Sequence, residues 1–181
     1  MKPTRIALIF LASIILLFSN ACISNSGTGL VLDGPELMDG GSLPAEYTCS
    51  DDNISPEIHW SGAPQKTKSF VLIMEDIDAP GGSFIHWIVY DMTKSMILLP
   101  KRMAEAGSIP GGTRQGTNSF GVIGYSGPCP PAGETHRYVF TIYALEARLD
   151  LDPGIDIDRL KEVMAARILE QTSLTVTYSM P

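Results

Sequence analysis

Apolar and polar residues alternate along much of this chain in short runs that are typical of β-strands. The clearest pair of runs is Ser69–Glu75 and Phe84–Asp91, in which aromatic and β-branched residues dominate. Between them lie Pro80, Gly81 and Gly82, a combination that cannot continue a strand. The pattern therefore predicts two strands joined by a tight connection.

Other runs have the same character. Strands are predicted at Glu57–Trp60, Arg137–Glu146 and Ser173–Ser179, and a short edge strand at Ile97–Pro100. His59, on the first of these strands, is interpreted as a structural histidine, since most polar strand residues face solvent.

Only one segment has a strong helical pattern. Leu160, Val163, Met164 and Ile168 follow helical spacing, and Asp156 or Asp158 can cap the start of the helix. A single helix among many short strands predicts a mainly β, antiparallel domain.

The first residues are typical of an export signal. Lys2 and Arg5 precede the apolar run Ile6–Phe18, which is too short to span a bilayer. The small residues before Cys22 resemble a bacterial lipoprotein cleavage site, although Ser19 stands where Leu is preferred. We therefore expect a lipoprotein-type signal peptide over 1–21, lipidation of Cys22 and membrane anchoring, with a secreted or periplasmic soluble protein as the alternative.

Charge narrows the range of partners. The whole chain carries a net charge of −7, and loss of Lys2 and Arg5 with the signal leaves 11 basic residues against 20 acidic ones, or −9. This acidity disfavours nucleic acid and provides no polybasic membrane patch, so membrane contact would come through the lipid on Cys22. Residues 22–29 are expected to form a flexible tether, and 30–181 a single domain.

Two cysteines remain in the expected mature domain, Cys49 and Cys129. An even pair in an exported chain favours a disulfide, and the alternative is two buried free thiols.

Polar side chains that could bind a ligand or take part in catalysis occur at the ends of the predicted strands. Asp76 and Asp78 leave the first long strand two residues apart, which in an extended chain directs both side chains to one side. His86 returns on the next strand, and His136 stands at the entrance of the strand that carries Tyr138. These residues predict a pocket rim built from carboxylates, imidazoles and a phenol.

A stiff loop precedes His136. Pro128, Pro130 and Pro131 surround Cys129, and Gly127 has no Cβ that would keep a ligand from the backbone. We interpret the loop as a second pocket wall.

Together these stretches resemble the phosphatidylethanolamine-binding protein family, also called the Raf kinase inhibitor protein family, and most closely its bacterial branch. A departure is Ile77, where many members have Pro. The resemblance rests on several motifs that occur in the family's order: Asp76-Ile77-Asp78-Ala79-Pro80, His86-Trp87, Gly127-Pro128-Cys129-Pro130-Pro131 with Gly133, His136-Arg137-Tyr138, Tyr47-Thr48-Cys49, Asn53-Ile54-Ser55-Pro56, Trp60-Ser61-Gly62-Ala63-Pro64 and Asn118-Ser119-Phe120-Gly121.

The resemblance implies a β-sandwich-like fold and a small pocket for phosphate or phosphoryl head groups such as phosphoethanolamine. We expect no cofactor and no metal. Carried over residue by residue, the ligand-binding set is Asp76, Asp78, Pro80, His86, Gly127, Pro128, His136 and Tyr138.

Two other functions stay open at this point. The pocket could recognise a phosphorylated residue or acidic peptide on a protein partner, or the protein could inhibit an envelope enzyme. A homodimer is also open.

An enzyme is disfavoured, because no serine or cysteine has an evident base partner. A metal site built from Asp76, His86 and His136 is likewise the weaker hypothesis.

Overall fold

The computed structural model describes residues 29–109 and 111–180. The signal peptide, Cys22 and most of the expected tether lie outside the described residues. Within the described part, no helix has both the length and the apolar character needed to cross a membrane.

Two antiparallel sheets form the domain. The smaller sheet has the order β1-β2-β5, and the larger has the order β6-β7-β4-β3-β8-β9. The strands of the smaller sheet are β1 (Val31–Asp33), β2 (Ile58–Ser61) and β5 (Leu98–Leu99). Those of the larger sheet are β6 (Ser108–Ile109), β7 (Thr113–Gln115), β4 (Phe84–Thr93), β3 (Ser69–Asp76), β8 (Thr135–Leu145) and β9 (Ile168–Ser179).

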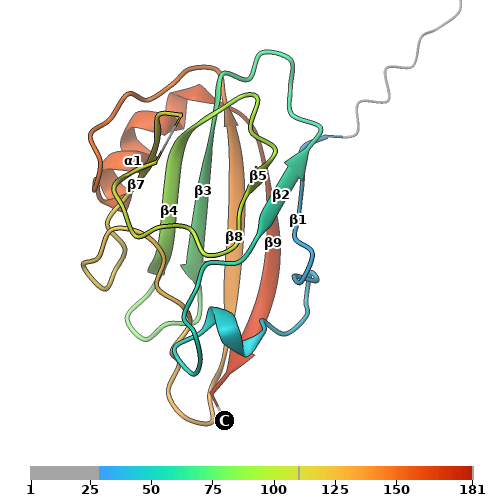
Figure 1. Ribbon diagram of the computed structural model, residues 1–181, viewed down its shortest axis with the longest axis vertical. Helices are drawn as coiled ribbons and strands as arrows, with labels where there is room; N and C mark the ends of the chain where they lie inside the picture. Colours follow the sequence, from blue (N-terminus) through green and yellow to red (C-terminus); the bar gives the residue numbers. More distant parts are fainter. Residues whose placement is uncertain (1–28, 110, 181) are drawn as a thin grey trace, which may run out of the picture.

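The two faces of the large sheet are buried against different partners. The small sheet covers one face, where Leu72, Trp87 and Phe140 belong to the larger apolar cluster. Helix α1 (Ile157–Met164) covers part of the other face, where Leu160 and Met164 pack with residues of β3 and β4 (Figure 1). The prediction of a mainly β, sandwich-like antiparallel domain with one C-terminal helix is confirmed.

The helix is shorter than its apolar stripe predicts. The Asp156 carboxylate caps it by accepting from the backbone N–H of Arg159 at 2.8 Å. The helix ends at Met164, a 3-10 turn (Ala165–Arg167) follows, and Ile168 already begins β9. The placement of Ile168 on the helix was therefore wrong, because β9 is an edge strand whose polar residues hide its alternation.

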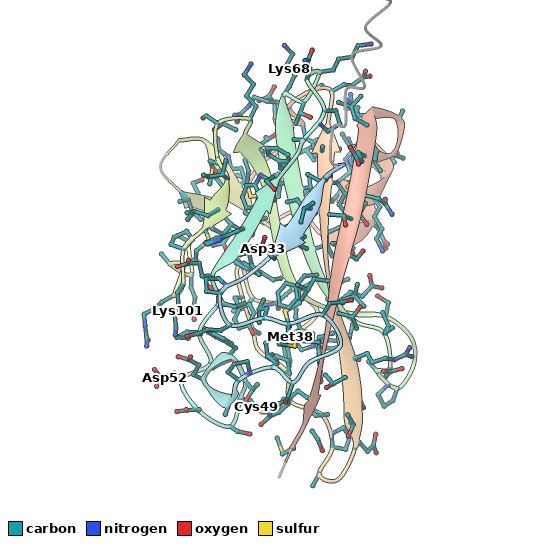
Figure 2. All side chains as sticks on the ribbon, turned by 90° about the vertical axis from the view of Figure 1, so that its right-hand side faces the viewer. Asp33, Met38, Cys49, Asp52, Lys68 and Lys101 are labelled. Atoms are coloured by element: carbon teal, nitrogen blue, oxygen red, sulfur yellow. A yellow bond between two sulfur atoms is a disulfide. The ribbon has the colours of Figure 1, made fainter. Side chains whose placement is uncertain are left out.

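The site-bearing ends of three strands meet at one end of the large sheet. The last residue of β3, Asp76, pairs with Phe84 of β4 on one side and with Tyr138 of β8 on the other. In Figure 2 this end of the domain carries Cys49, while Lys68, just before β3, lies at the opposite end.

The packing of α1 leads to a stability prediction. Leu160 is fully buried against the sheet, whereas its neighbour Lys161 is exposed. We expect Leu160→Ala to lower the free energy of unfolding by about 2–5 kcal/mol, since truncation leaves a cavity. Lys161→Ala is the control and should change it by less than about 0.5 kcal/mol. Urea denaturation measures both; equal midpoints for the two variants would contradict the packing described.

Candidate functional site

A hollow of about 370 Å³ lies where the ends of β3 and β4 meet two loops. Its size is within the range of small-molecule pockets. Polar groups occupy one part of the lining and apolar ones the rest. The lining residues are Asp76, Ala79, Pro80, Phe84, His86, Phe120 and Cys129.

His86 reaches this hollow through a β-bulge. Along β4, Trp87 pairs with Met74 and Ile85 pairs with Glu75, so His86 has no partner on β3. An extra residue of this kind breaks the alternation of faces. As a result His86 and Trp87 both face the side of the sheet that carries Tyr138. Simple alternation would have separated them.

A loop residue fixes the orientation of the His86 ring. Ser126 donates its backbone N–H to the His86 carbonyl at 3.1 Å, and its own carbonyl lies 2.6 Å from Nδ1 of His86. Because a carbonyl only accepts, Nδ1 carries the proton. The neutral ring therefore keeps a lone pair on Nε2, for which the described residues provide no hydrogen-bond partner.

Asp76 and His136 form a buried pair beside the hollow. Nδ1 of His136 lies 2.7 Å from Oδ2 of Asp76, and both side chains are about 5% exposed. On its other edge, Nε2 of His136 lies 3.3 Å from a carboxylate oxygen of the exposed Glu134. Both ring nitrogens of His136 are thus engaged, so this ring has no spare donor for a ligand unless Glu134 moves away.

Tyr138 lies between the two histidine rings. Its ring centroid is 5.3 Å from that of His86 and 6.4 Å from that of His136. The side chain is fully buried, and its hydroxyl has no hydrogen-bond partner in the described part of the chain. Burial and the neighbouring Asp76 carboxylate raise the pKa of Tyr138, and its side chain lies behind the lining of the hollow and not in it.

Asp78 lies away from the hollow. Strand β3 ends at Asp76, so the extended geometry that would direct both carboxylates to one side does not continue. The Asp78 carboxylate accepts from the Arg137 side chain at 2.6 and 2.8 Å, and these hydrogen bonds lower its pKa to about 2. Asp78 shapes the turn, while its backbone N–H donates to Asp76 at 2.9 Å.

Gly127 and Pro128 connect their loop to neighbouring loops and do not line the hollow. A Cβ on Gly127 would lie 2.3 Å from the Tyr47 carbonyl, so the glycine is required by packing between loops and not by a ligand's approach. The Gly127 N–H donates to Asn53 at 2.7 Å, and the Pro128 carbonyl accepts from Cys49 at 3.0 Å.

The predicted disulfide between Cys49 and Cys129 is present. It links chain positions 80 residues apart, with 5.4 Å between the Cα atoms. Its Cys129 half lines the hollow, a role that cysteine pairing alone did not indicate.

An aromatic wall was missed by the sequence reasoning. The Phe84 and Phe120 ring centroids lie 4.8 Å apart, and the His86 ring is within 5.6 Å of both. Phe120 belongs to a loop shaped by Asn118, whose side-chain oxygen accepts from the backbone N–H of Phe120 at 3.0 Å. The Asn118–Phe120 motif was noted only as a family match, because loop conformation is not readable from strand periodicity.

The two site histidines have opposite protonation tendencies. Burial lowers the pKa of His86, which favours its neutral form. The hydrogen bond that His136 donates to Asp76 raises the pKa of His136, with a further contribution from Glu134. Within the described residues, no three His, Cys, Asp or Glu side chains are grouped to hold a metal ion.

The fold and the hollow define an antiparallel β protein with a cavity of small-molecule size at one end of its large sheet. Comparison with known proteins gives the family: residues 33–179 match the model of the phosphatidylethanolamine-binding protein family. The chain belongs to this family, and membership indicates a small binding protein.

Individual relatives and solved structures support the same family assignment. The chain is 41% identical to a UPF0098 protein of Methanothermobacter thermautotrophicus over 77% of its own length and 92% of the relative's. It is also 41% identical to UPF0098 protein YbhB of Escherichia coli, over 80% of this chain and 96% of that one. The crystal structure of E. coli YbcL, described as a member of the mammalian PEBP family, matches with a TM-score of 0.79 at 30% identity, covering 84% and 99% of the two chains. A PEBP homologue from Chlamydia trachomatis matches with a TM-score of 0.78 at 35% identity and the same coverage.

The Asp76–His136 pair leads to a titration prediction. By NMR we expect His136 to titrate above its ordinary pKa of about 6.5 and His86 below it. Asp76→Asn should lower the pKa of His136, because the largest cause of its rise is removed. Asp158→Asn, which removes an exposed carboxylate from α1, should leave it unchanged.

The raised pKa of His136 also determines how the stability of the fold changes with pH. The raised pKa of His136 adds stability that is fully present below about pH 6.5 and is lost as the pH rises through the folded-state value. An unchanged His136 titration in Asp76→Asn would contradict the pairing.

Proposed function

We propose that this protein binds a phosphoryl head group, such as that of phosphoethanolamine, in the hollow beside His86 without covalent chemistry. The observation that carries the proposal is the fixed His86 ring, whose Nδ1 is engaged by Ser126 while Nε2 is left for a ligand. A singly protonated phosphoryl group can donate its hydroxyl to that nitrogen, and a protonated His86 can donate to a phosphoryl oxygen. The family's name supports the same class of ligand.

The rest of the lining suits an ammonium group. Asp76 brings a carboxylate to the hollow, and Phe84 and Phe120 present aromatic rings. An ammonium is attracted both by a carboxylate and by the face of an aromatic ring. A ligand with a phosphoryl group and an amine therefore matches the lining better than phosphate alone.

Binding is favoured over hydrolysis because neither Cys129 nor Ser126, the nucleophilic residues nearest to His86, is activated for attack on a ligand. The Cys129 sulfur is held in the disulfide with Cys49. Ser126 lies close to His86, but its hydroxyl oxygen accepts from Asn118 at 3.0 Å while His86 contacts the Ser126 carbonyl. Neither arrangement is an activated nucleophile paired with a base.

Calorimetry tests the proposal. Glycerophosphoethanolamine is a phosphodiester with no second ionisation, so its titration does not obscure that of the protein. We expect its affinity to rise as the pH falls below about 6.5, because His86, whose pKa is lowered, becomes a cationic donor there. His86→Gln should weaken binding by about 1–3 kcal/mol and remove the pH dependence.

His59→Gln is the matched control. His59 lies on β2, is paired with Glu57 at 2.7 Å, and lies outside the lining of the hollow. Equal affinity in wild type and His86→Gln would overturn the proposal.

We also propose that the protein is exported and anchored through a lipid on Cys22, on the sequence pattern given above. Cell fractionation should find the full-length chain with membranes, and Cys22→Ser should move it to the soluble fraction. Ser24→Ala, two residues further on, should stay with the membranes. Retention of Cys22→Ser with membranes would contradict the anchor.

A further inference from the structure

We propose that Glu134 determines specificity, by making the hollow discriminate against doubly charged phosphate monoesters in favour of singly charged phosphodiesters. The inference rests on the proposed function, since it concerns which phosphoryl ligand the same hollow accepts.

Glu134 is placed by local structure on the ligand side of β8. Its backbone N–H donates to the Pro131 carbonyl at 3.0 Å, which closes a turn directly before the strand. Side chains two residues apart along an extended chain share a face. His136 and Tyr138 therefore share the face of β8 that continues into the core at Phe140, and Glu134, one residue before the strand, lies on this side through its contact with His136.

The two carboxylates on His136 differ in how firmly they are held. Asp76 is buried and its contact with the ring is 2.7 Å, whereas Glu134 is 56% exposed and its contact is 3.3 Å. Charge-assisted hydrogen bonds are shortest and strongest when well aligned and desolvated. Glu134 is thus the displaceable partner, and it occupies the one N–H of His136 that an anionic ligand could take.

The charges near His136 leave an anion in a net negative surrounding. Asp76 and Glu134 contribute two negative charges, and His136 contributes at most one positive charge, so the sum is negative whether or not the ring is protonated. Asp78 and Arg137 are joined in an ion pair and nearly cancel. His86 and Tyr138 are the other titratable groups described on this face, and burial favours the neutral form of both by lowering the pKa of His86 and raising that of Tyr138.

A dianion is repelled about twice as strongly as a monoanion by the same field, because Coulomb energy is proportional to charge. Glu134 is the exposed source of the uncompensated negative charge. Removing its charge should therefore help a monoester more than a diester.

The experiment compares two ligands in three proteins at about pH 8, where the phosphate monoester is mainly dianionic. The ligands are phosphoethanolamine and glycerophosphoethanolamine, and the variants are Glu134→Gln and the control Glu162→Gln. Glu162 is an exposed carboxylate on α1. We expect Glu134→Gln to raise the affinity ratio of monoester to diester by about three- to tenfold, and Glu162→Gln to leave it unchanged.

A second measurement separates this role from a structural one. NMR titration of Glu134→Gln should show a lower pKa for His136, because one of the groups that raise it has gone. A ratio equal to that of wild type, with binding intact, would overturn this inference alone. Because protonation of His86 strengthens binding, wild type is also titrated at about pH 5.5, where the monoester is mainly a monoanion. A monoester-to-diester ratio that does not fall from the lower to the higher of the two pH values would overturn this inference alone. Failure of wild type to bind either ligand at both pH values would overturn the proposed function and this inference with it.

Discussion

The pairing of β3 with both of its neighbours is the constraint on which the site depends. Asp76 ends β3 opposite Phe84 on one side and Tyr138 on the other, so three strands bring their polar side chains together at one end of the sheet, beside the hollow. The site histidines come from the two outer strands of this trio, and Asp76 lies between them and holds one of them. Pairing of this kind explains why residues distant along the chain act as one cluster.

The bulge at His86 adds what regular pairing could not provide. If regular alternation were continued back from Trp87, the imidazole would face α1, on the opposite side of the sheet from Tyr138. The extra residue turns it to the hollow, where Ser126 then clamps both its backbone and its ring. Bulges often re-aim side chains next to functional sites, and here one does so for the ring on which the proposed function rests.

The long strands were predictable from the sequence because Ser69–Asp76 and Phe84–Thr93 are almost continuously buried and rich in β-branched and aromatic residues. The family motifs likewise gave the fold, and the even pair of cysteines in a chain expected to be exported gave the disulfide partners. Three local details were out of reach: the outward turn of Asp78, the packing reason for Gly127 and the aromatic wall of Phe120. Each depends on loop conformation, which side-chain periodicity does not encode.

The buried pair of His136 and Asp76 joins residues 60 positions apart. No local segment of the chain can form it, and contacts of such long sequence separation form slowly, since the loop between them must first be closed. Formation of this pair is consequently an index of completed folding. A fragment or a partly assembled intermediate would contain most of the strands and still lack the hollow.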